Sequence, residues 1–319
     1  MREYAPIALF CYNRVDLLQQ TIAALQKNDL ADKSDLFIFA DGAKSQAGIH
    51  AVNEVREYIR TVSGFRSVTI KEAEKNLGLA KSIISGVTEV VNKYGRIIVI
   101  EDDIVTAPYF LQWMNDALDM YEHDEQVAGI HGWTPPEKFG KRPETYFVRE
   151  VGCWGWATWK RGWDIFEADG KKLLEQFSSK RMIYDFNQCY SYPYYQMLKE
   201  QVAGTCDSWA IRWYASVFLK NKVGLWPGKT LVSNIGFSSG SNFDAVSRIP
   251  EDVISSQPPR LERQKNIVSA DNLLKTVYKN YNKSYFSVSK PNDCRTRFLL
   301  SMFREEVLTW FKNNLFFRK

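Results

Sequence analysis

The sequence predicts an α/β fold with a mostly parallel central sheet and helices on both faces. Short runs of β-forming apolar residues alternate with longer amphipathic segments along the first hundred residues. Residues 97–100 form a run of four aliphatic side chains, which is typical of a strand buried on both faces of a sheet. Several of these runs end in charged side chains, as expected where the strand ends of an open sheet hold a ligand.

The expected elements follow from the period of the apolar residues. In the first half we expect strands over 7–11, 36–40, 67–71 and 96–100, separated by helices over 17–25, 51–62 and 80–93. Asp16 is the predicted cap of the first helix. In the second half we expect a helix over 108–121, a strand over 127–131, a loop over 135–143, a Gly- and Trp-rich turn over 152–159, helical residues over 171–203 and a helix with Asp207 in its first turn.

These elements suggest a domain over residues 1–245, which divides at about residue 105 where the pattern changes, and an appendage over 246–319. Residues 250–263 contain Pro258-Pro259 and are typical of a linker. The remaining residues are expected to form a helical, basic C-terminal extension.

Composition excludes several function classes. The net charge is +5, and residues 290–319 carry most of it with seven Lys/Arg against three acids, so nucleic-acid binding is not expected. The five cysteines are scattered without metal-binding or disulfide spacing, which favours a reducing, cytoplasmic compartment. We find no signal peptide and no apolar run of about 18 residues, so we expect a chain that does not span a membrane.

Three carboxylates, Glu101, Asp102 and Asp103, directly follow the strand at 96–100. Burying one unpaired carboxylate costs several kcal/mol, so the three are expected at the open end of the strand, facing water or a cation. One alternative is a solvated turn. Another is the Walker B strand of an NTPase, but residues 78–82 lack the glycine that a phosphate loop needs before its lysine.

Seven short segments in order resemble the glycosyltransferases of the GT-A fold, and most closely the N-acetylglucosaminyltransferase I family and its bacterial relatives. The resemblance covers roughly residues 5–243. It implies that residues 1–245 are a catalytic domain, with a nucleotide-sugar half to about residue 105 and an acceptor half over residues 106–245. It is carried by residues 6–14, Phe39-Ala40-Asp41-Gly42, residues 98–103, residues 107–110, the turn at 152–156, residues 207–212 and the glycine-serine loop after Ser233.

The resemblance implies roles for individual residues. Arg14 is expected to contact the nucleotide diphosphate and Asp41 to accept from a uracil ring. Glu101 and Asp102 are expected at the donor sugar and ribose, Asp103 at a divalent metal, Mn or Mg, and Asp207 as the catalytic base. Further expected donor-binding residues are Phe10, Tyr12 and Lys81; the expected pocket residues are Trp154, Gly155, Trp156, Trp209 and Arg212; and the expected lid loop contains Gly236 and Gly240.

For several of these residues the alternative is a structural role. Asp207 is also placed where a helix cap or first-turn acid occurs. Trp154, Trp156, Trp209 and Arg212 suit a packed core as well as a sugar-binding wall. The late loop has Gly240-Ser241-Asn242 where many GT-A enzymes have a histidine, so the metal is expected to depend on Asp103, the diphosphate and water.

The expected reaction is transfer of a sugar from a nucleotide-sugar donor to a saccharide or lipid-linked acceptor. One base opposite one leaving group implies a single displacement with inversion. Alternatives are a sugar-nucleotide pyrophosphorylase, for which the basic glycine-rich signature after the first strand is missing, and a non-catalytic module that binds glycans or nucleotide sugars. The donor sugar, the linkage and the oligomeric state do not follow from the sequence.

The C-terminal residues 295–319 carry an apolar helical stripe surrounded by Lys and Arg. Trp and Phe beside basic residues suit the interface of an anionic membrane, so we expect peripheral contact with the inner face of the cytoplasmic membrane. The alternative is that the stripe packs on the domain or on a second subunit.

Overall fold

The computed structural model describes residues 3–188, 192–236, 254–273, 276–277 and 280. In this part of the chain one sheet has the strand order β3-β2-β1-β4-β8-β6-β9-β7, and β10 pairs with β5 in a small second sheet. The strands are β1 Ile7–Cys11, β2 Asp35–Ala40, β3 Ser67–Glu72, β4 Arg96–Glu101, β5 Ile104–Thr106, β6 Val127–His131, β7 Thr145–Val148, β8 Trp156–Trp159, β9 Val223–Pro227 and β10 Val232–Asn234.

The first four strands of the sheet are parallel. β1 lies between β2 and β4, and Phe10 is in register with Phe39 on one side and Glu101 on the other. The connections are α1 Val15–Gln26, α2 Ile49–Ile59 and α3 Leu79–Tyr94, with short 3-10 turns at Ala31–Lys33 and Gln46–Gly48. The predicted alternation is therefore confirmed, and the carboxyl ends of these strands lie at one edge of the sheet.

The second half of the sheet is mixed. β8 lies antiparallel between β4 and β6, β9 is parallel to β6, and β7 is antiparallel to β9. Of these strands the sequence predicted only β6. The others are four or five residues long and rich in buried aromatic side chains, so their apolar residues do not alternate with polar ones.

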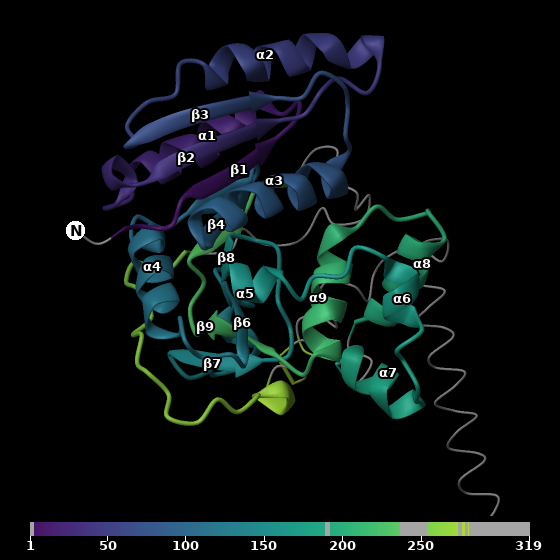
Figure 1. Ribbon diagram of the computed structural model, residues 1–319. Coiled ribbons are helices and arrows are strands. Elements are labelled where there is room, and N and C mark those ends of the chain that lie inside the picture. Colours follow the sequence, from purple (N-terminus) through teal and green to yellow (C-terminus); the bar gives the residue numbers. More distant parts are fainter. Residues whose placement is uncertain (1–2, 189–191, 237–253, 274–275, 278–279, 281–319) are drawn as a thin grey trace, which may run out of the picture.

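Alternate side chains of the strands face two separate apolar clusters. Leu9, Ile38 and Ile100 pack with α1, α2 and α4 (Phe110–Met120) on one face. Phe10 and Val99 pack with α3, α5 (Lys160–Trp163) and α9 (Trp209–Leu219) on the other. The sheet is thus covered by helices on both faces (Figure 1), which confirms the predicted fold class.

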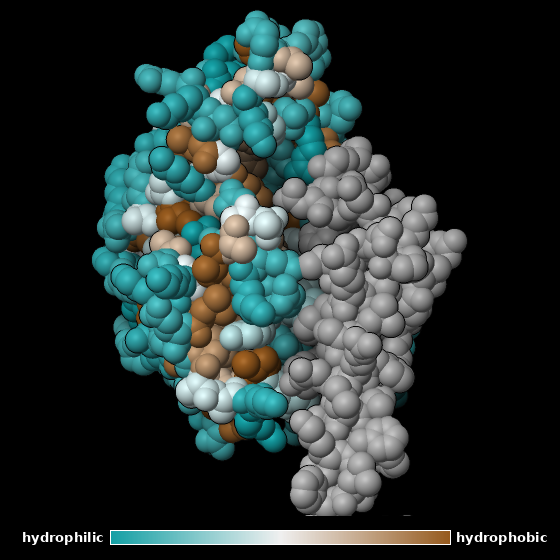
Figure 2. Space-filling model, turned by 90° about the vertical axis from the view of Figure 1, so that its right-hand side faces the viewer, coloured by the Kyte–Doolittle hydropathy of each residue, from teal (hydrophilic) through white to brown (hydrophobic). Residues whose placement is uncertain are grey.

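Two predictions about helices need correction. α1 begins at Val15, so Asp16 lies inside its first turn and does not cap it. Residues 171–203 are not one helical stretch but contain α6 Gly170–Leu174, α7 Lys180–Phe186 and α8 Tyr194–Val202. These helices lie beside α9 (Figure 1). Figure 2 shows one face of the molecule, which carries a band of apolar side chains between hydrophilic ones.

The described part of the predicted linker packs on the domain. We call residues 254–273 the C-terminal strap. It passes alongside α4 and beneath β7 (Figure 1), where Ala270 N donates to Phe147 O at 2.6 Å and Trp113 Nε1 donates to Pro259 O at 3.1 Å. Arg149 pairs with Asp271 at 2.5 Å.

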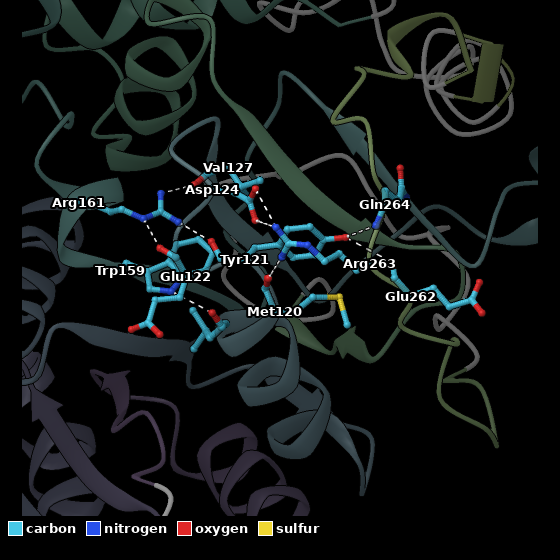
Figure 3. A network of polar contacts seen from close by, with 11 residues as sticks. Met120, Tyr121, Glu122, Asp124, Val127, Trp159, Arg161, Glu262, Arg263 and Gln264 are labelled. Carbon is cyan, nitrogen blue, oxygen red and sulfur yellow. Dashed lines mark hydrogen bonds and ion pairs between the residues drawn. The ribbon is translucent and has the colours of Figure 1, made fainter.

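Figure 3 shows how the strap meets the end of α4. Arg263 donates to Met120 O and pairs with Asp124 at 2.8 Å, while Gln264 N donates to the Tyr121 hydroxyl at 3.1 Å. On the other side of the same turn, Arg161 donates to three backbone carbonyls at 2.7–2.8 Å. The turn is therefore held from both sides, and the strap is part of the folded domain.

No helix among the described residues is long and apolar enough to cross a membrane. Residues 237–253 and the tail at 295–319, on which the lid and membrane predictions partly depend, lie outside the described residues.

Candidate functional site

Charged side chains from three neighbouring strands meet at the carboxyl edge of the parallel half of the sheet. Arg14 follows β1, Asp41 follows β2, and Asp102 and Asp103 follow β4. Asp41 N donates to Cys11 O at 3.0 Å, which extends the pairing of β1 and β2 to this edge. The predicted convergence of these strand ends is therefore present in the structure.

Arg14 joins two of the acids. Its Nη2 pairs with Asp102 Oδ1 and, at 2.9 Å, with Asp103 Oδ2. The Arg14 side chain is 28% exposed, whereas those of Asp102 and Asp103 are 5% and 13% exposed. One cation thus serves two carboxylates that are largely withdrawn from water.

The cluster carries more acid than one arginine neutralises. Burial and the charges of Asp103 and Asp102 raise the pKa of Glu101 to about 8, so it is mostly protonated at neutral pH. Burial also raises the pKa of Asp102 to about 6, with the charge of Arg14 acting in the opposite direction. A further positive charge at this edge would be favourable.

The backbone of Gly236 covers the Arg14–Asp103 pair. β10 pairs with β5 directly after the acids, and Ile235 N donates to Asp103 O at 2.9 Å. A Cβ on Gly236 would lie 2.1 Å from Asp103 Oδ2 and 3.0 Å from Arg14 Nη1, so a larger residue here would displace the Asp103 carboxylate. The start of the predicted lid loop therefore touches the acids, while Gly240 lies outside the described residues.

Asp41 holds the loop that begins α3. Its Oδ1 accepts from Gly42 N and Leu77 N, both at 2.8 Å, and its Oδ2 accepts from Asn76 Nδ2 and Gly78 N, both at 3.0 Å. Four hydrogen bonds fill the acceptor sites of a carboxylate. In this conformation Asp41 thus has no lone pair left for a uracil ring, and its observed partners are the loop residues.

Asp207 lies next to the same loop. Its Oδ2 lies 3.4 Å from the place that a Cβ on Gly78 would occupy, and Gly78 has a left-handed φ of 78°. The residue that caps α9 is Ser208, whose hydroxyl accepts from Ile211 N at 3.2 Å. Asp207 is exposed and precedes this cap, so the alternative of a helix cap or first-turn acid is wrong.

The predicted aromatic wall is not present at Trp156 and Trp209. Both are 2% exposed and stack on each other with ring centroids 5.3 Å apart, inside the apolar cluster beneath α3. Arg212 is 8% exposed and donates to Ser208 O and Ala168 O at 3.2 and 2.9 Å, so it packs within this part of the domain. Indole rings at these positions build the core.

The predicted donor residue Phe10 is also a core residue. It is 4% exposed and stacks on Phe39 at 4.9 Å beneath α3, where Gly86 leaves room for its ring. Gly155 is buried with a φ of 59°, and a Cβ there would lie 2.9 Å from a Val232 methyl group. It serves a tight turn before β8 rather than a pocket.

Three predicted residues are accessible or partly so. Lys81 is exposed on the first turn of α3, and the half-buried Tyr12 accepts from Lys44 N at 3.1 Å. Trp154 is half-buried with its ring edge-on to Trp133 at 4.9 Å. Their roles toward a donor or acceptor stay predictions.

Sequence reasoning missed two residues at the site. Asn76 donates to both Asp41 Oδ2 and Gly42 O, which joins the two loops; its place two residues before the glycine that begins α3 was the available signal. Cys153 lies in the Gly-rich turn, and burial together with the nearby charges of Glu101 and Asp103 raises the pKa of its thiol. Cys153 is therefore a neutral neighbour of the acids.

The residues present fit a hard divalent cation that is shared with a phosphate. Among the described residues no group of three or more His, Cys, Asp or Glu side chains is arranged to hold a metal alone. Asp102 and Asp103 nevertheless already hold a cationic group, and their oxygens are the donor type that Mg or Mn prefers. Such cations often bind through one or two carboxylates and the phosphates of a substrate.

No protein-family model and no curated protein matches this chain. Solved structures do show some likeness, at 12% sequence identity. TarS from S. aureus has a TM-score of 0.32. The match covers 47% of this chain and only 28% of TarS. A mannosyltransferase from Pyrobaculum calidifontis, in complex with GDP-Man and Mn2+, has a TM-score of 0.34 over 67% of this chain and 74% of that one.

A third similar structure is a putative nucleotide-diphospho-sugar transferase from Desulfovibrio desulfuricans G20. It has a TM-score of 0.32, with 51% of this chain and 68% of that chain covered at 12% identity. Likenesses at this level do not assign a function to the chain. The assignment of a function therefore depends on the site itself.

Proposed function

We propose that this chain is a metal-dependent, inverting glycosyltransferase of the GT-A type. It moves a sugar from a nucleotide-diphosphate donor, a UDP-sugar, to a hydroxyl of a saccharide or lipid-linked glycan. The observation that carries the proposal is the pairing of Arg14 with Asp102 and Asp103 at the carboxyl ends of parallel strands. Ligands of open α/β sheets bind at this edge.

The first requirement of the reaction is stabilisation of the departing diphosphate. Arg14 is partly exposed at this edge and always charged, so it is suited to pair with phosphate oxygens. Asp103, with Asp102 beside it, would hold the divalent cation. When bound, that cation supplies further positive charge against the leaving group.

The second requirement is removal of the acceptor proton. Asp207 is exposed, does not cap α9 and lies against the loop that Asp41 holds, so it is the candidate base. It takes the proton from the attacking hydroxyl while the bond between the anomeric carbon and the diphosphate breaks. A single displacement of this kind inverts the anomeric configuration.

The proposed setting is the synthesis of a surface polysaccharide at the inner face of the cytoplasmic membrane. It is supported by the apolar and basic pattern of residues 295–319. Binding to anionic vesicles that is lost on removal of this segment is the expected result, and equal binding by both proteins would contradict it.

The test is release of nucleotide diphosphate from a panel of nucleotide sugars with Mn or Mg and a saccharide acceptor. The Asp207→Asn variant should keep donor binding and lose about 100-fold or more in turnover, the scale for a general base. Asp169→Asn is a matched control, because Asp169 is also exposed and only caps the neighbouring helix α6.

Other outcomes would point to the alternatives. Donor binding without any release of nucleotide diphosphate would favour a non-catalytic binding module. Release of pyrophosphate from a nucleoside triphosphate and a sugar phosphate would favour a pyrophosphorylase. Retention of the anomeric configuration, determined by NMR, would exclude the single displacement.

A further inference from the structure

The Arg14 guanidinium is placed as a cation between two acids. Its Nη2 contacts a carboxylate oxygen of both Asp102 and Asp103, and its Nη1 faces the backbone of Gly236. Arginine does not lose its proton in proteins, so this contact cannot be released by deprotonation of the guanidinium. At constant pH it is released when another cation takes over the acids or another anion takes over the arginine.

Both replacements belong to the proposed donor. A divalent cation would compete with Arg14 for Asp103 Oδ2, which Arg14 contacts at 2.9 Å. A diphosphate offers the guanidinium several anionic oxygens, with which arginine forms short, charge-assisted hydrogen bonds. The same residue therefore has one set of anionic partners before donor binding and another set available after it.

We propose that Arg14 is the internal counter-ion of Asp102 and Asp103, that a divalent cation displaces it from Asp103, and that it then pairs with the donor diphosphate. This inference rests on the proposed function and adds an exchange of partners at the same site. Arg14 thereby opposes metal binding in the absence of nucleotide and supports nucleotide binding in the presence of metal.

The charges explain why the two ligands bind together. A divalent cation that arrives alone meets a positive guanidinium within a few ångströms, and Arg14 loses a carboxylate partner without gaining another. When the diphosphate arrives as well, each cationic group has an anionic partner. The cation and the nucleotide therefore raise each other's affinity, and this coupling must be the same in both directions.

The experiment measures Mn2+ binding from the EPR signal of free Mn2+, first without nucleotide. Arg14→Gln should bind Mn2+ about tenfold or more tightly than the wild type, because one elementary charge close to a divalent ion is worth about that much even at the dielectric constant of water. Arg60→Gln is the matched control. It also removes one positive charge, but from the exposed pair of Arg60 with Glu72, and should leave Mn2+ binding unchanged.

The second measurement is the affinity for UDP at saturating Mn2+, by calorimetry. Arg14→Gln should bind UDP about tenfold or more weakly than the wild type, since it lacks the guanidinium. One substitution thus acts in opposite directions on the two ligands. A merely structural arginine would weaken both.

Arg14→Lys keeps the proposal testable where Arg14→Gln loses its fold, as checked by circular dichroism. A lysine keeps the charge on a single ammonium group, so both affinities should lie between those of wild type and Arg14→Gln. Mn2+ affinity that is unchanged or weaker in both variants would overturn the exchange. Unchanged UDP affinity would overturn its second half.

Failure of the proposed function would give a different result. In that case neither the wild type nor Arg14→Gln binds Mn2+ even with UDP present, and the metal site itself is refuted together with the exchange. Mn2+ and UDP binding by the wild type, with no gain in Arg14→Gln, would refute the exchange alone.

Discussion

Replacement of Asp41 by asparagine separates two roles for this residue: holding the loop at 76–78, and contacting the base of the nucleotide. An asparagine keeps one carbonyl oxygen for Gly42 N and Leu77 N, but its amide group then faces Gly78 N and Asn76 Nδ2, which are also donors. Two hydrogen bonds to a charged acceptor are lost, each worth about 1.5–3 kcal/mol. Because residues 76–78 are half-buried and water replaces part of this loss, we expect about 2–4 kcal/mol.

The assay is urea unfolding of Asp41→Asn together with its turnover and its nucleotide affinity. We expect the stability loss to be accompanied by lower turnover, because the loop that faces Asp207 is no longer held, while nucleotide affinity changes less. Asp35→Asn is the control at the opposite end of β2. It loses contacts to Arg66 and Ser67, and among the described residues its hydrogen bonds go to these two and not to the loop at 76–78.

One result would refute this assignment. Suppose that the free energy of unfolding of Asp41→Asn lies within about 0.5 kcal/mol of the wild-type value and that the variant nevertheless loses nucleotide binding. Asp41 then contacts the base, as the family resemblance implies, and its hydrogen bonds to the loop are secondary.

Three further changes test other parts of the structure. Burial lowers the pKa of His131 to about 3, so at this residue only the unfolded state gains a proton as the pH falls below about 6.5, and His131 contributes a loss of about 1.4 kcal/mol per pH unit; urea titrations of His131→Asn should differ from the wild type by this slope, whereas the same change at the exposed His123 should leave the pH dependence closer to that of the wild type. Gly236→Ala should abolish metal-dependent nucleotide binding with little change in Tm, since a Cβ there meets a carboxylate oxygen at 2.1 Å; unaltered binding would show that the backbone yields easily. Removal of residues 254–319 should lower Tm and solubility because it removes the strap, whereas removal of 295–319 should keep the domain folded.

The parallel half of the fold follows from the sequence because its signals are local. β1, β2 and β4 each contain a continuous apolar run, each helix has its own period, and Asp102 and Asp103 closely follow the apolar run at 97–100. Parallel connection then places these ends at one edge without further information.

The rest depends on contacts between distant residues. Trp156 and Trp209 have the composition of a sugar-binding wall, but their environment is set by β8 lying between β4 and β6, a pairing for which the local sequence carries no signal. The strap looks like a linker because Trp113 and Arg263 attach it through backbone carbonyls, which every residue has. The sequence correctly predicts Asp41 at the end of β2, but its partners come from a loop 35 residues away.

The strand order has a consequence for synthesis of the chain on the ribosome. All pairs within β3-β2-β1-β4 are available once residue 101 has emerged, but the outer edge of β4 stays open until β8 arrives at Trp156. The pairing of β7 is delayed still longer, because its partner strand β9 begins only at Val223. At about 5–20 residues per second these edges remain exposed for several seconds. Unpaired edges are templates for aggregation, so nascent chains that stall between β4 and β8 are the species that chaperones must protect.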